Sequence, residues 1–370
     1  MDFIIEKKKL LDCLNHFQSV VEKRNTIPIL SNIKITVDQS NENMLILSAT
    51  DLALEISESL EANIVKKGGI TIPSQIFYDL IRKAPDGCSI TISFDDNSNN
   101  VVVLFNNSKF NFPTMPIDDF PVIDGKDLEK TIDLDNKSLR HLINNCKFCM
   151  GLDESRQYLN GVFFHLSNDQ ISTVATDGHR LAKCVLQDKN EIDFEGIIIP
   201  KKSIYEISKI LDETEGNVKL SFSKTRLKVV IGRIIIITKL INSSFPDYES
   251  VIPKEEEQIM VANCKKFSET IDRVATISNE KFRTVRFNIK DNLCTVSSSG
   301  SDKSSGKETI KVEYSGSEIN INFNSRYILD VLNLIKDGEV SFNFSKDTSP
   351  TVLKSNSFKN TLFLIMQMRS

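Results

Sequence analysis

The sequence predicts an α+β protein built from three repeated domains, each with two helices packed on antiparallel sheets. The main evidence is a set of landmarks that recur at nearly one offset. Ala49-Thr50-Asp51 returns after 126 residues as Ala175-Thr176-Asp177, Ile72-Pro73 after 127 as Ile199-Pro200, and Phe120-Pro121 after 125 as Phe245-Pro246. A third copy is indicated by a helical pattern that begins at Asn324, 124 residues beyond Pro200. We therefore expect domains at 1–125, 126–250 and 251–370.

Each repeat is expected to open with a short strand and an amphipathic helix, and the spacing of apolar residues predicts these helices at 8–21, 136–150 and 264–277. A second helix should follow Pro73, Pro200 and Asn324. Its apolar stripe is formed in the three copies by Ile76, Phe77, Leu80 and Ile81, by Ile204, Ile207, Ile210 and Leu211, and by Tyr327, Ile328, Val331 and Leu332. A glycine-containing turn then leads into strands at 89–94, 218–222 and 340–344.

Composition places the chain among soluble globular proteins, with 40% hydrophobic and 26% charged residues and a formal net charge of −4. It has no apolar run of about 18 residues and no signal-peptide pattern at its start, so we expect a cytoplasmic protein with no membrane contact. Cys146 and Cys149 have CxxC spacing but lack a second pair, and we interpret all seven cysteines as ordinary thiols. No cofactor is expected.

Basic side chains gather on one face of several predicted helices. The groups are Lys137, Arg140 and Lys147, then Lys201, Lys202 and Lys209, and then Lys265, Lys266 and Arg273. On any single helix such a face is typical of a solvated surface. Its recurrence on corresponding helices of an acidic protein favours contact with one polyanion, through phosphates and without reading sequence.

The most distinctive segment of the chain is Thr176-Asp177-Gly178-His179-Arg180-Leu181-Ala182. Asp177 and His179 could serve a hydrolase or a metal enzyme, or the segment could be a structural turn at the rim of a binding site. No histidine has metal-type spacing, and the chain contains no phosphate-binding glycine loop and no GxSxG motif. We favour the binding rim and expect no catalytic residue and no metal site.

The chain resembles the family of bacterial DNA polymerase III beta subunits, the sliding clamps. The resemblance spans nearly the whole chain. It is carried by Thr26-Ile27-Pro28-Ile29-Leu30-Ser31-Asn32, Tyr158-Leu159-Asn160-Gly161, the segment from Val174 to Ala182, Phe245-Pro246-Asp247-Tyr248, Ser278-Asn279-Glu280-Lys281-Phe282-Arg283, Tyr327-Ile328-Leu329-Asp330-Val331-Leu332 and Met366-x-Met368-Arg369.

The resemblance implies a non-enzymatic processivity factor with the DNA-clamp fold. Two copies would close head to tail into a homodimeric ring around double-stranded DNA, with helices facing the hole. A cleft between the second and third domains would bind short linear peptides of the replicative polymerase, the clamp loader and repair proteins. The matching cleft positions are Leu159, Thr176, Gly178, His179, Arg180, Leu181, Pro246, Val251, Asn324, Tyr327, Ile365, Met366, Met368 and Arg369.

Within this cleft, Leu181, Val251, Ile365 and Met366 are expected to form an apolar pocket. His179, Arg180 and Arg369 are expected to fix the polar groups of the peptide. The chain departs from the family pattern at Ser250, Gln367 and Ser370. These departures leave open which peptide is preferred, and the sequence also leaves open a clamp paralogue that binds partners without supporting replication.

Expected DNA contacts combine the helix faces with positions that match the family, and they are Arg24, Lys137, Arg140, Lys147, Arg156, Tyr158, Lys201, Lys202, Lys265 and Lys266. Such contacts need only be weak, because a ring holds DNA by encircling it. At the dimer contact, Phe110 and Phe112 are expected to face Ile277. The facing segment 297–307 is rich in serine and has Asp302 as its one acidic residue. We therefore expect apolar contact and sheet continuation to hold the ring together.

Overall fold

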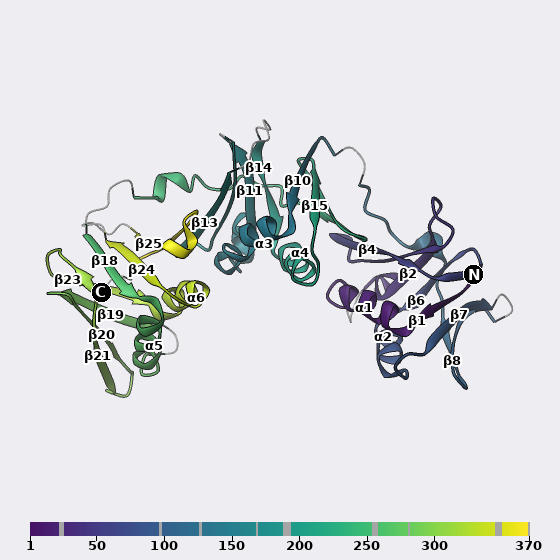
Figure 1. Cartoon of the computed structure of the whole chain (residues 1–370), viewed down its shortest axis with the longest axis horizontal. Helices are drawn as coiled ribbons and strands as arrows, with labels where there is room; N and C mark the ends of the chain where they lie inside the picture. Colours follow the sequence, from purple (N-terminus) through teal and green to yellow (C-terminus); the bar gives the residue numbers. More distant parts are fainter. Residues whose placement is uncertain are drawn as a thin grey trace. The chain divides into compact units, whose positions relative to one another are not determined.

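A computed structural model describes residues 1–21, 26–95, 98–125, 128–167, 169–187, 194–253, 258–279, 282–344 and 350–368 (Figure 1). The chain divides into two compact units, which are described separately. The first contains Met1–Arg140 and Lys202–Leu240, and the second contains His141–Lys201 and Ile241–Ser370. Both are built from antiparallel sheets with helices, as the sequence predicts.

The first unit holds two sheets. The five-stranded sheet has the order β5-β1-β7-β8-β9 and consists of β1 (Asp2–Glu6), β5 (Asn63–Lys66), β7 (Ser89–Asp95), β8 (Asn100–Phe105) and β9 (Ser108–Pro113). The eight-stranded sheet has the order β10-β15-β16-β17-β4-β3-β2-β6. Its strands are β2 (Asn32–Val37), β3 (Met44–Thr50), β4 (Leu54–Glu61), β6 (Gly69–Pro73), β10 (Lys130–Asp135), β15 (Asn217–Phe222), β16 (Arg226–Ile231) and β17 (Ile234–Lys239).

One pairing in the larger sheet joins two of the expected repeats. Strand β17 pairs antiparallel with β4, and Ile236 lies opposite Ile56. Both side chains are fully buried, so the core is continuous across this pair. The second unit contains the corresponding junction between β13 and β26, where Leu181 lies opposite Leu364. The repeats are thus connected by backbone hydrogen bonds within shared sheets, not only by the linkers between them.

The second unit also holds two sheets. The nine-stranded sheet has the order β14-β11-β12-β13-β26-β25-β24-β18-β22, with β11 (Gly161–Ser167), β12 (Gln170–Thr176), β13 (Arg180–Gln187), β14 (Phe194–Pro200), β18 (Gln258–Asn263), β22 (Glu313–Tyr314), β24 (Glu339–Phe344), β25 (Thr351–Ser355) and β26 (Thr361–Ile365). The four-stranded sheet has the order β21-β20-β19-β23, with β19 (Thr284–Lys290), β20 (Leu293–Ser299), β21 (Ser305–Lys311) and β23 (Ile319–Asn324).

Six α-helices occur in the described part of the chain, at the places that the repeat predicts. They are α1 (Lys7–Phe17), α2 (Ser74–Lys83), α3 (Asn136–Asn144), α4 (Lys201–Glu213), α5 (Cys264–Ala275) and α6 (Ser325–Ile335). The second helix of each repeat starts directly after Pro73, Pro200 or Asn324. In α6 the Asn324 side chain accepts a hydrogen bond from Arg326 N, which caps a backbone donor that the helix leaves without a partner.

Three helices end earlier than predicted, and the smallest difference is at α5, which ends at Ala275 and not at residue 277. Helix α1 stops at Phe17, not residue 21, because the sequence continues with Ser19, Val20 and Val21, which have weak helix propensity. Helix α3 stops at Asn144, and a short 3-10 turn, η3 (Lys147–Cys149), replaces its predicted last turn.

A buried histidine connects three elements of the first unit. The His16 ring on α1 lies between two carboxylates, with Nδ1 2.7 Å from Glu58 on β4 and Nε2 3.0 Å from Glu213 on α4. Burial alone would lower the pKa of His16, but the hydrogen bonds and negative charges of Glu58 and Glu213 outweigh it, and the pKa is raised. The second unit holds a comparable bridge around Arg180, described below.

The cysteines show no sign of metal or redox chemistry. All seven are free thiols, and Cys146 and Cys149 of the CxxC spacing are buried. Burial raises the pKa of both thiols, which keeps them protonated and unreactive. Among the residues that the structure describes, no group of His, Cys, Asp and Glu could hold a metal ion. Within the same residues, every helix is too short or too polar to cross a membrane.

Candidate functional site

The distinctive segment forms a tight turn between β12 and β13. The Thr176 hydroxyl donates to Arg180 O at 2.7 Å and accepts from Gly178 N at 3.1 Å. Asp177 Oδ1 accepts from the backbone N–H groups of His179 and Arg180 at 2.9 and 3.0 Å. Gly178 has φ of 87°, a conformation that glycine adopts without strain. The carboxylate is therefore committed to the turn, which argues against an Asp177–His179 catalytic pair.

Arg180 is the most connected side chain of this region. Its Nε donates to Asp177 Oδ2 at 3.0 Å, its Nη1 to Asp330 Oδ2 of α6 at 2.5 Å, and its Nη2 to Phe148 O of η3 at 2.8 Å. The guanidinium carbon also lies 4.6 Å from the centre of the Tyr327 ring. Only 11% of the side chain is exposed, so the charge is compensated inside the protein.

His179 and the C-terminal strand complete the rim. The imidazole is exposed and stacks on Tyr327, with ring centres 6.2 Å apart and planes inclined by 17°. His179 O accepts from Met366 N at 2.8 Å, so the residues after β26 run directly beside the turn. Met368 N donates in turn to Asn322 O at 2.8 Å.

A cavity of about 530 Å³ opens at this turn. It collects five of the residues expected in the cleft, namely Leu159, His179, Arg180, Asn324 and Tyr327. The rest of its lining is Met150, Gly151, Leu152, Asp153, Arg156, Asn160, Asp177, Arg283 and Arg326. Four arginines against two aspartates make it a polar and mainly cationic site. It suits polar or anionic groups of a ligand rather than an apolar anchor.

The apolar part of the region surrounds Leu181. This buried side chain clusters with Val174, Tyr248, Val352 and Leu364. Phe163, Phe245, Ile252 and Leu362 pack against that cluster and are partly exposed. The rings of Phe163 and Phe245 are nearly parallel, with centres 4.7 Å apart. This cluster is a candidate surface for an apolar side chain of a ligand, and it adds Leu364, Phe245, Tyr248 and Val352 to the residues that the sequence suggested.

The strand register corrects one expected member of the apolar pocket. Leu181 lies opposite Leu364, whereas Arg180 lies opposite Ile365. Residues opposite one another in an antiparallel pair share a face. Ile365 is therefore on the face of Arg180 and is fully buried, so it cannot join Leu181 in one pocket. The sequence of the last strand does not show which of its residues face Leu181, because this depends on its register against β13.

The other cleft residues are placed as follows. Pro246, Val251 and Met366 are exposed, the last two at 48% and 40%. Gly178 is also exposed, while Thr176 and Met368 are partly buried. Of the departures from the family pattern, Ser250 donates to Asp247 O at 2.8 Å, and Gln367 is partly buried. Arg369 and Ser370 lie outside the described residues.

The structure separates the expected DNA contacts into exposed, ion-paired and partly buried residues. Lys137, Lys265 and Lys266 are exposed. Arg140 pairs with Asp212 at 2.7 Å, Arg156 with Asp153 at 3.1 Å, and Lys202 with Asp51 at 2.5 Å. Lys147, Tyr158 and Lys201 are partly buried, and burial lowers the pKa of Lys201, with Arg180 adding to the effect. Arg24 lies outside the described residues.

At the expected dimer contact, the two phenylalanines of β9 differ. Phe110 is 37% exposed, whereas Phe112 is 6% exposed and packs edge-on against Phe77 of α2 at 6.1 Å. Phe112 therefore packs against the core of its own chain, and its expected contact with a partner stays a prediction. Ile76, next to Phe77, is a missed candidate because it is 64% exposed. Ile277 is partly exposed and lies over Gly306 of β21.

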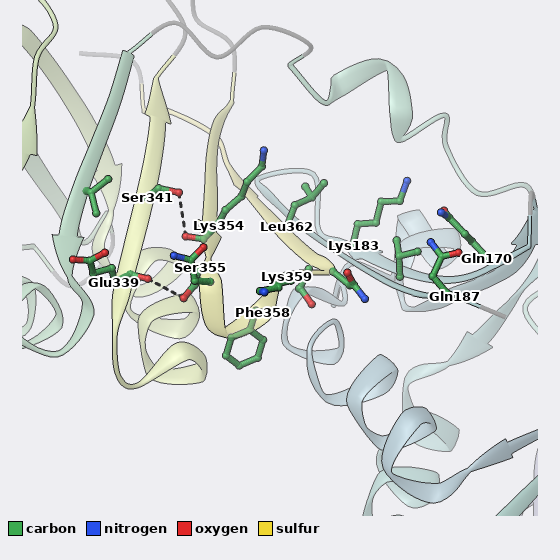
Figure 2. Close-up of a pocket in the computed structure, with 15 residues that line it drawn as sticks. Gln170, Lys183, Gln187, Glu339, Ser341, Lys354, Ser355, Phe358, Lys359 and Leu362 are labelled. Carbon is green, nitrogen blue, oxygen red and sulfur yellow. Dashed lines mark hydrogen bonds between the residues drawn. The ribbon is translucent and has the colours of Figure 1, made fainter.

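A larger cavity, of about 690 Å³, lies elsewhere in the second unit (Figure 2). Figure 2 shows Leu362 between Lys183 and Lys354, and it draws the hydrogen bonds from Ser341 to Lys354 O and from Ser355 to Glu339 O. Lys183 is already paired with Glu249 at 3.2 Å. None of the site residues expected from the sequence lines this cavity. The smaller cavity at the Thr176–Arg180 turn is the better candidate.

Comparison with known proteins identifies the family. Three family models match in order: the N-terminal domain of the DNA polymerase III beta subunit at residues 1–124, the central domain at 133–247 and the C-terminal domain at 249–369. The beta sliding clamps of Caulobacter vibrioides and Escherichia coli K12 are 35% and 30% identical, each over 100% of both chains.

Solved structures agree with the sequence comparisons. The sliding clamp of Pseudomonas aeruginosa bound to griselimycin has a TM-score of 0.95 at 30% identity, over 100% of both chains. The Caulobacter crescentus clamp has a TM-score of 0.94 at 35% identity with the same coverage. These matches confirm the predicted three-domain clamp fold. The chain therefore belongs to the DNA polymerase III beta subunit family, the sliding clamps, which act as processivity factors in DNA replication and not as catalysts.

Proposed function

We propose that this sliding clamp works as a head-to-tail dimeric ring around duplex DNA and binds partner proteins through the cleft at the Thr176–Arg180 turn. Its three domains are assigned to 1–125, 126–250 and 251–370, which the ranges of the three family models support. The observation that carries the cleft is the polar cavity at His179 and Tyr327, together with the apolar cluster around Leu181 in the same unit.

Two edge strands support the dimer. Strand β9 ends the five-stranded sheet and β21 ends the four-stranded sheet, so each has one edge without a partner strand in the described chain. Such edges pair readily with another chain. The exposed apolar residues Phe110 and Ile76 accompany β9, and Ile277 accompanies β21. Because the two edges belong to different parts of the chain, pairing β9 of one copy with β21 of another is a head-to-tail contact.

DNA contact is proposed to be weak and independent of sequence. The exposed lysines Lys137 on α3 and Lys265 and Lys266 on α5 supply positive charge for phosphates. The net charge of −4 argues against tight binding of DNA by the open protein. Encirclement accounts for retention without tight contact, and weak screened contacts permit sliding.

The cleft is proposed to bind short peptides of the replicative polymerase, the clamp loader and repair proteins. Apolar anchors of the peptide would contact Val251, Met366 and the cluster around Leu181. Its polar groups would enter the cavity beside His179, Asn324 and Tyr327. Recognition of a short extended segment by a few apolar anchors and a polar pocket is a common mode of peptide binding.

Sedimentation of the protein with nicked-circular DNA and with the same DNA made linear tests the ring. We expect a dimer, loaded by a clamp loader, that stays on the circle and is lost from the linear ends. A stable monomer that releases both DNAs alike would overturn the ring. Complementation of replication separates the replicative clamp from a paralogue that binds partners without supporting replication.

A further inference from the structure

The turn that carries the cleft has a counterpart in the first unit with the same hydrogen bonds. Thr50 Oγ1 donates to Leu54 O at 3.0 Å, and Asp51 Oδ1 accepts from Ala53 N and Leu54 N at 2.9 and 2.7 Å. By this correspondence Arg180 occupies the position of Leu54, which is 1% exposed. Replacing a buried leucine with arginine is unfavourable unless the charge is fully compensated.

The compensation of Arg180 uses all three of its nitrogens. Each donates to a different acceptor, and these acceptors come from the turn, from η3 and from α6. Asp330 makes the shortest of these bonds at 2.5 Å. These bonds use three of the five N–H groups of the guanidinium and fix its position in the protein.

The same bonds place the guanidinium against Tyr327. Asp330 lies three residues after Tyr327 on α6, so both side chains project from one side of the helix. Arg180 lies 4.6 Å from the Tyr327 ring, and the His179 ring stacks on that tyrosine. His179 is the exposed member of this series. A chain of contacts therefore runs from Asp330 through Arg180 and Tyr327 to the imidazole at the rim.

We propose that Asp330 is a positioning residue of the peptide cleft, which acts through Arg180 to hold the Tyr327–His179 stack in place and does not itself contact the peptide. This inference rests on the proposed function of the cleft. It gives Arg180, which lines the cavity, a second role as the link between Asp330 and the ring of Tyr327. It also adds Asp330, which does not line the cavity and was not expected in the site.

The test measures the affinity of the full-length dimer for a fluorescein-labelled peptide that carries the clamp-binding segment of the same bacterium's replicative polymerase. Asp330→Asn keeps the size of the side chain and removes its charge, and we expect about tenfold weaker binding. Asp330→Glu restores the carboxylate and should recover most of the affinity. Asp272→Asn, which removes an exposed charge from α5, is the matched control and should bind like the unmodified protein.

A spectroscopic readout separates positioning from a general loss of structure. The chain has four histidines, so the imidazole NMR signal of His179 is assigned by its loss in His179→Gln. Asp330→Asn should shift this signal in the absence of peptide, although Asp330 makes no bond to His179. Combining Asp330→Asn with His179→Ala should weaken binding hardly more than His179→Ala alone, because Asp330 acts through the histidine.

The outcomes are distinct. Failure of the unmodified dimer to bind the peptide would overturn the proposed function of the cleft itself. Peptide binding by the unmodified protein together with an unshifted His179 signal in Asp330→Asn would overturn the positioning role alone. Additive losses in the double variant would instead mean that Asp330 does not act through His179, which also contradicts the inference.

Discussion

The turn at residues 50–54 and the turn at residues 176–180 share their backbone hydrogen bonds but have different surroundings. The first has Leu52 with φ of 73° where the second has Gly178 with φ of 87°. In the first turn, Asp51 pairs with Lys202 at 2.5 Å, and Asp51 is itself largely buried. In the second, Asp177 pairs with Arg180, and a cavity opens beside it. The comparison teaches that a binding site can arise on a repeated backbone by exchange of a few side chains.

Each unit also holds a basic side chain between two carboxylates, but the basic residue differs. His16 lies between Glu58 and Glu213, and Arg180 lies between Asp177 and Asp330. Each cation connects a helix of one repeat with elements of the next. Arginine stays charged at every physiological pH, whereas histidine titrates near neutrality. Near neutral pH the first bridge is therefore sensitive to pH, whereas the second is not.

The largest expected effect comes from giving the first turn the cation of the second. Leu54→Arg buries a charge at a position where the nearby carboxylates are already engaged, Asp51 with Lys202 and Glu206, the counterpart of Asp330 on α4, with the Ser19 hydroxyl. We expect the free energy of unfolding to fall by about 4 kcal/mol. Guanidinium-induced unfolding measures it. Leu54→Met, which keeps the apolar volume, is the control and should cost less than about 1.5 kcal/mol. A loss below about 1 kcal/mol for Leu54→Arg would mean that the two turns are interchangeable.

The reverse exchange should cost somewhat less. Arg180→Leu leaves the carboxylates of Asp177 and Asp330 without their shared cation, and we expect a loss of about 3 kcal/mol in the second unit. Adding Asp330→Asn removes one of the stranded charges and should recover about 1 kcal/mol. Hydrogen exchange at β13 reports on this unit, and β4 serves as the internal reference. Equal effects on both strands would contradict a local role for the bridge.

A smaller effect is expected at the apolar rim of the second turn. Met366→Ala removes an exposed side chain that we place in the cleft, and labelled peptide should bind about tenfold more weakly. Sedimentation should still show a dimer, because β9 and β21 are not affected. Ile259→Ala, on β18 of the same unit and equally exposed at 40%, is the matched control. Equal losses in both variants would place the peptide elsewhere.

Features that depend on neighbouring residues could be predicted from the sequence, whereas features that depend on contacts between distant residues could not. The repeat, the six helix starts and the turn at residues 176–180 were predictable, because helical spacing and glycine or proline signals act within a few residues. Whether Leu364 or Ile365 shares the face of Leu181 depends on the register between β13 and β26, which are far apart in the sequence. The bridge from Arg180 to Asp330 spans 150 residues. Neither feature leaves a local pattern, and the burial of Phe112 becomes clear only from its contact with Phe77.

The smallest expected effect concerns the His16 bridge. The stability of the first unit should depend on pH near neutrality more than that of the second unit. The pKa of His16 is raised in the folded protein above its ordinary value of about 6.5. A group of this kind stabilises the fold fully below its unfolded pKa, and the contribution is lost as the pH rises through the folded pKa. The neutral ring has one N–H and can donate to only one carboxylate, so a bond is lost on deprotonation.

Between about pH 6 and pH 9 we therefore expect the protection factors of amides in β4 and α1, which are corrected for the base catalysis of exchange, to fall by a few-fold, with β13 changing less. His165 in the second unit shifts in the opposite direction, because burial and the charge of Lys183 lower its pKa. Its contribution is weakened below the ordinary pKa and is constant above it, so it does not mimic the change at alkaline pH. His16→Gln keeps one hydrogen bond and removes the titration, and it should abolish the pH dependence in the first unit. A persistent dependence in this variant would place the titrating group elsewhere and remove the proposed difference between the two bridges.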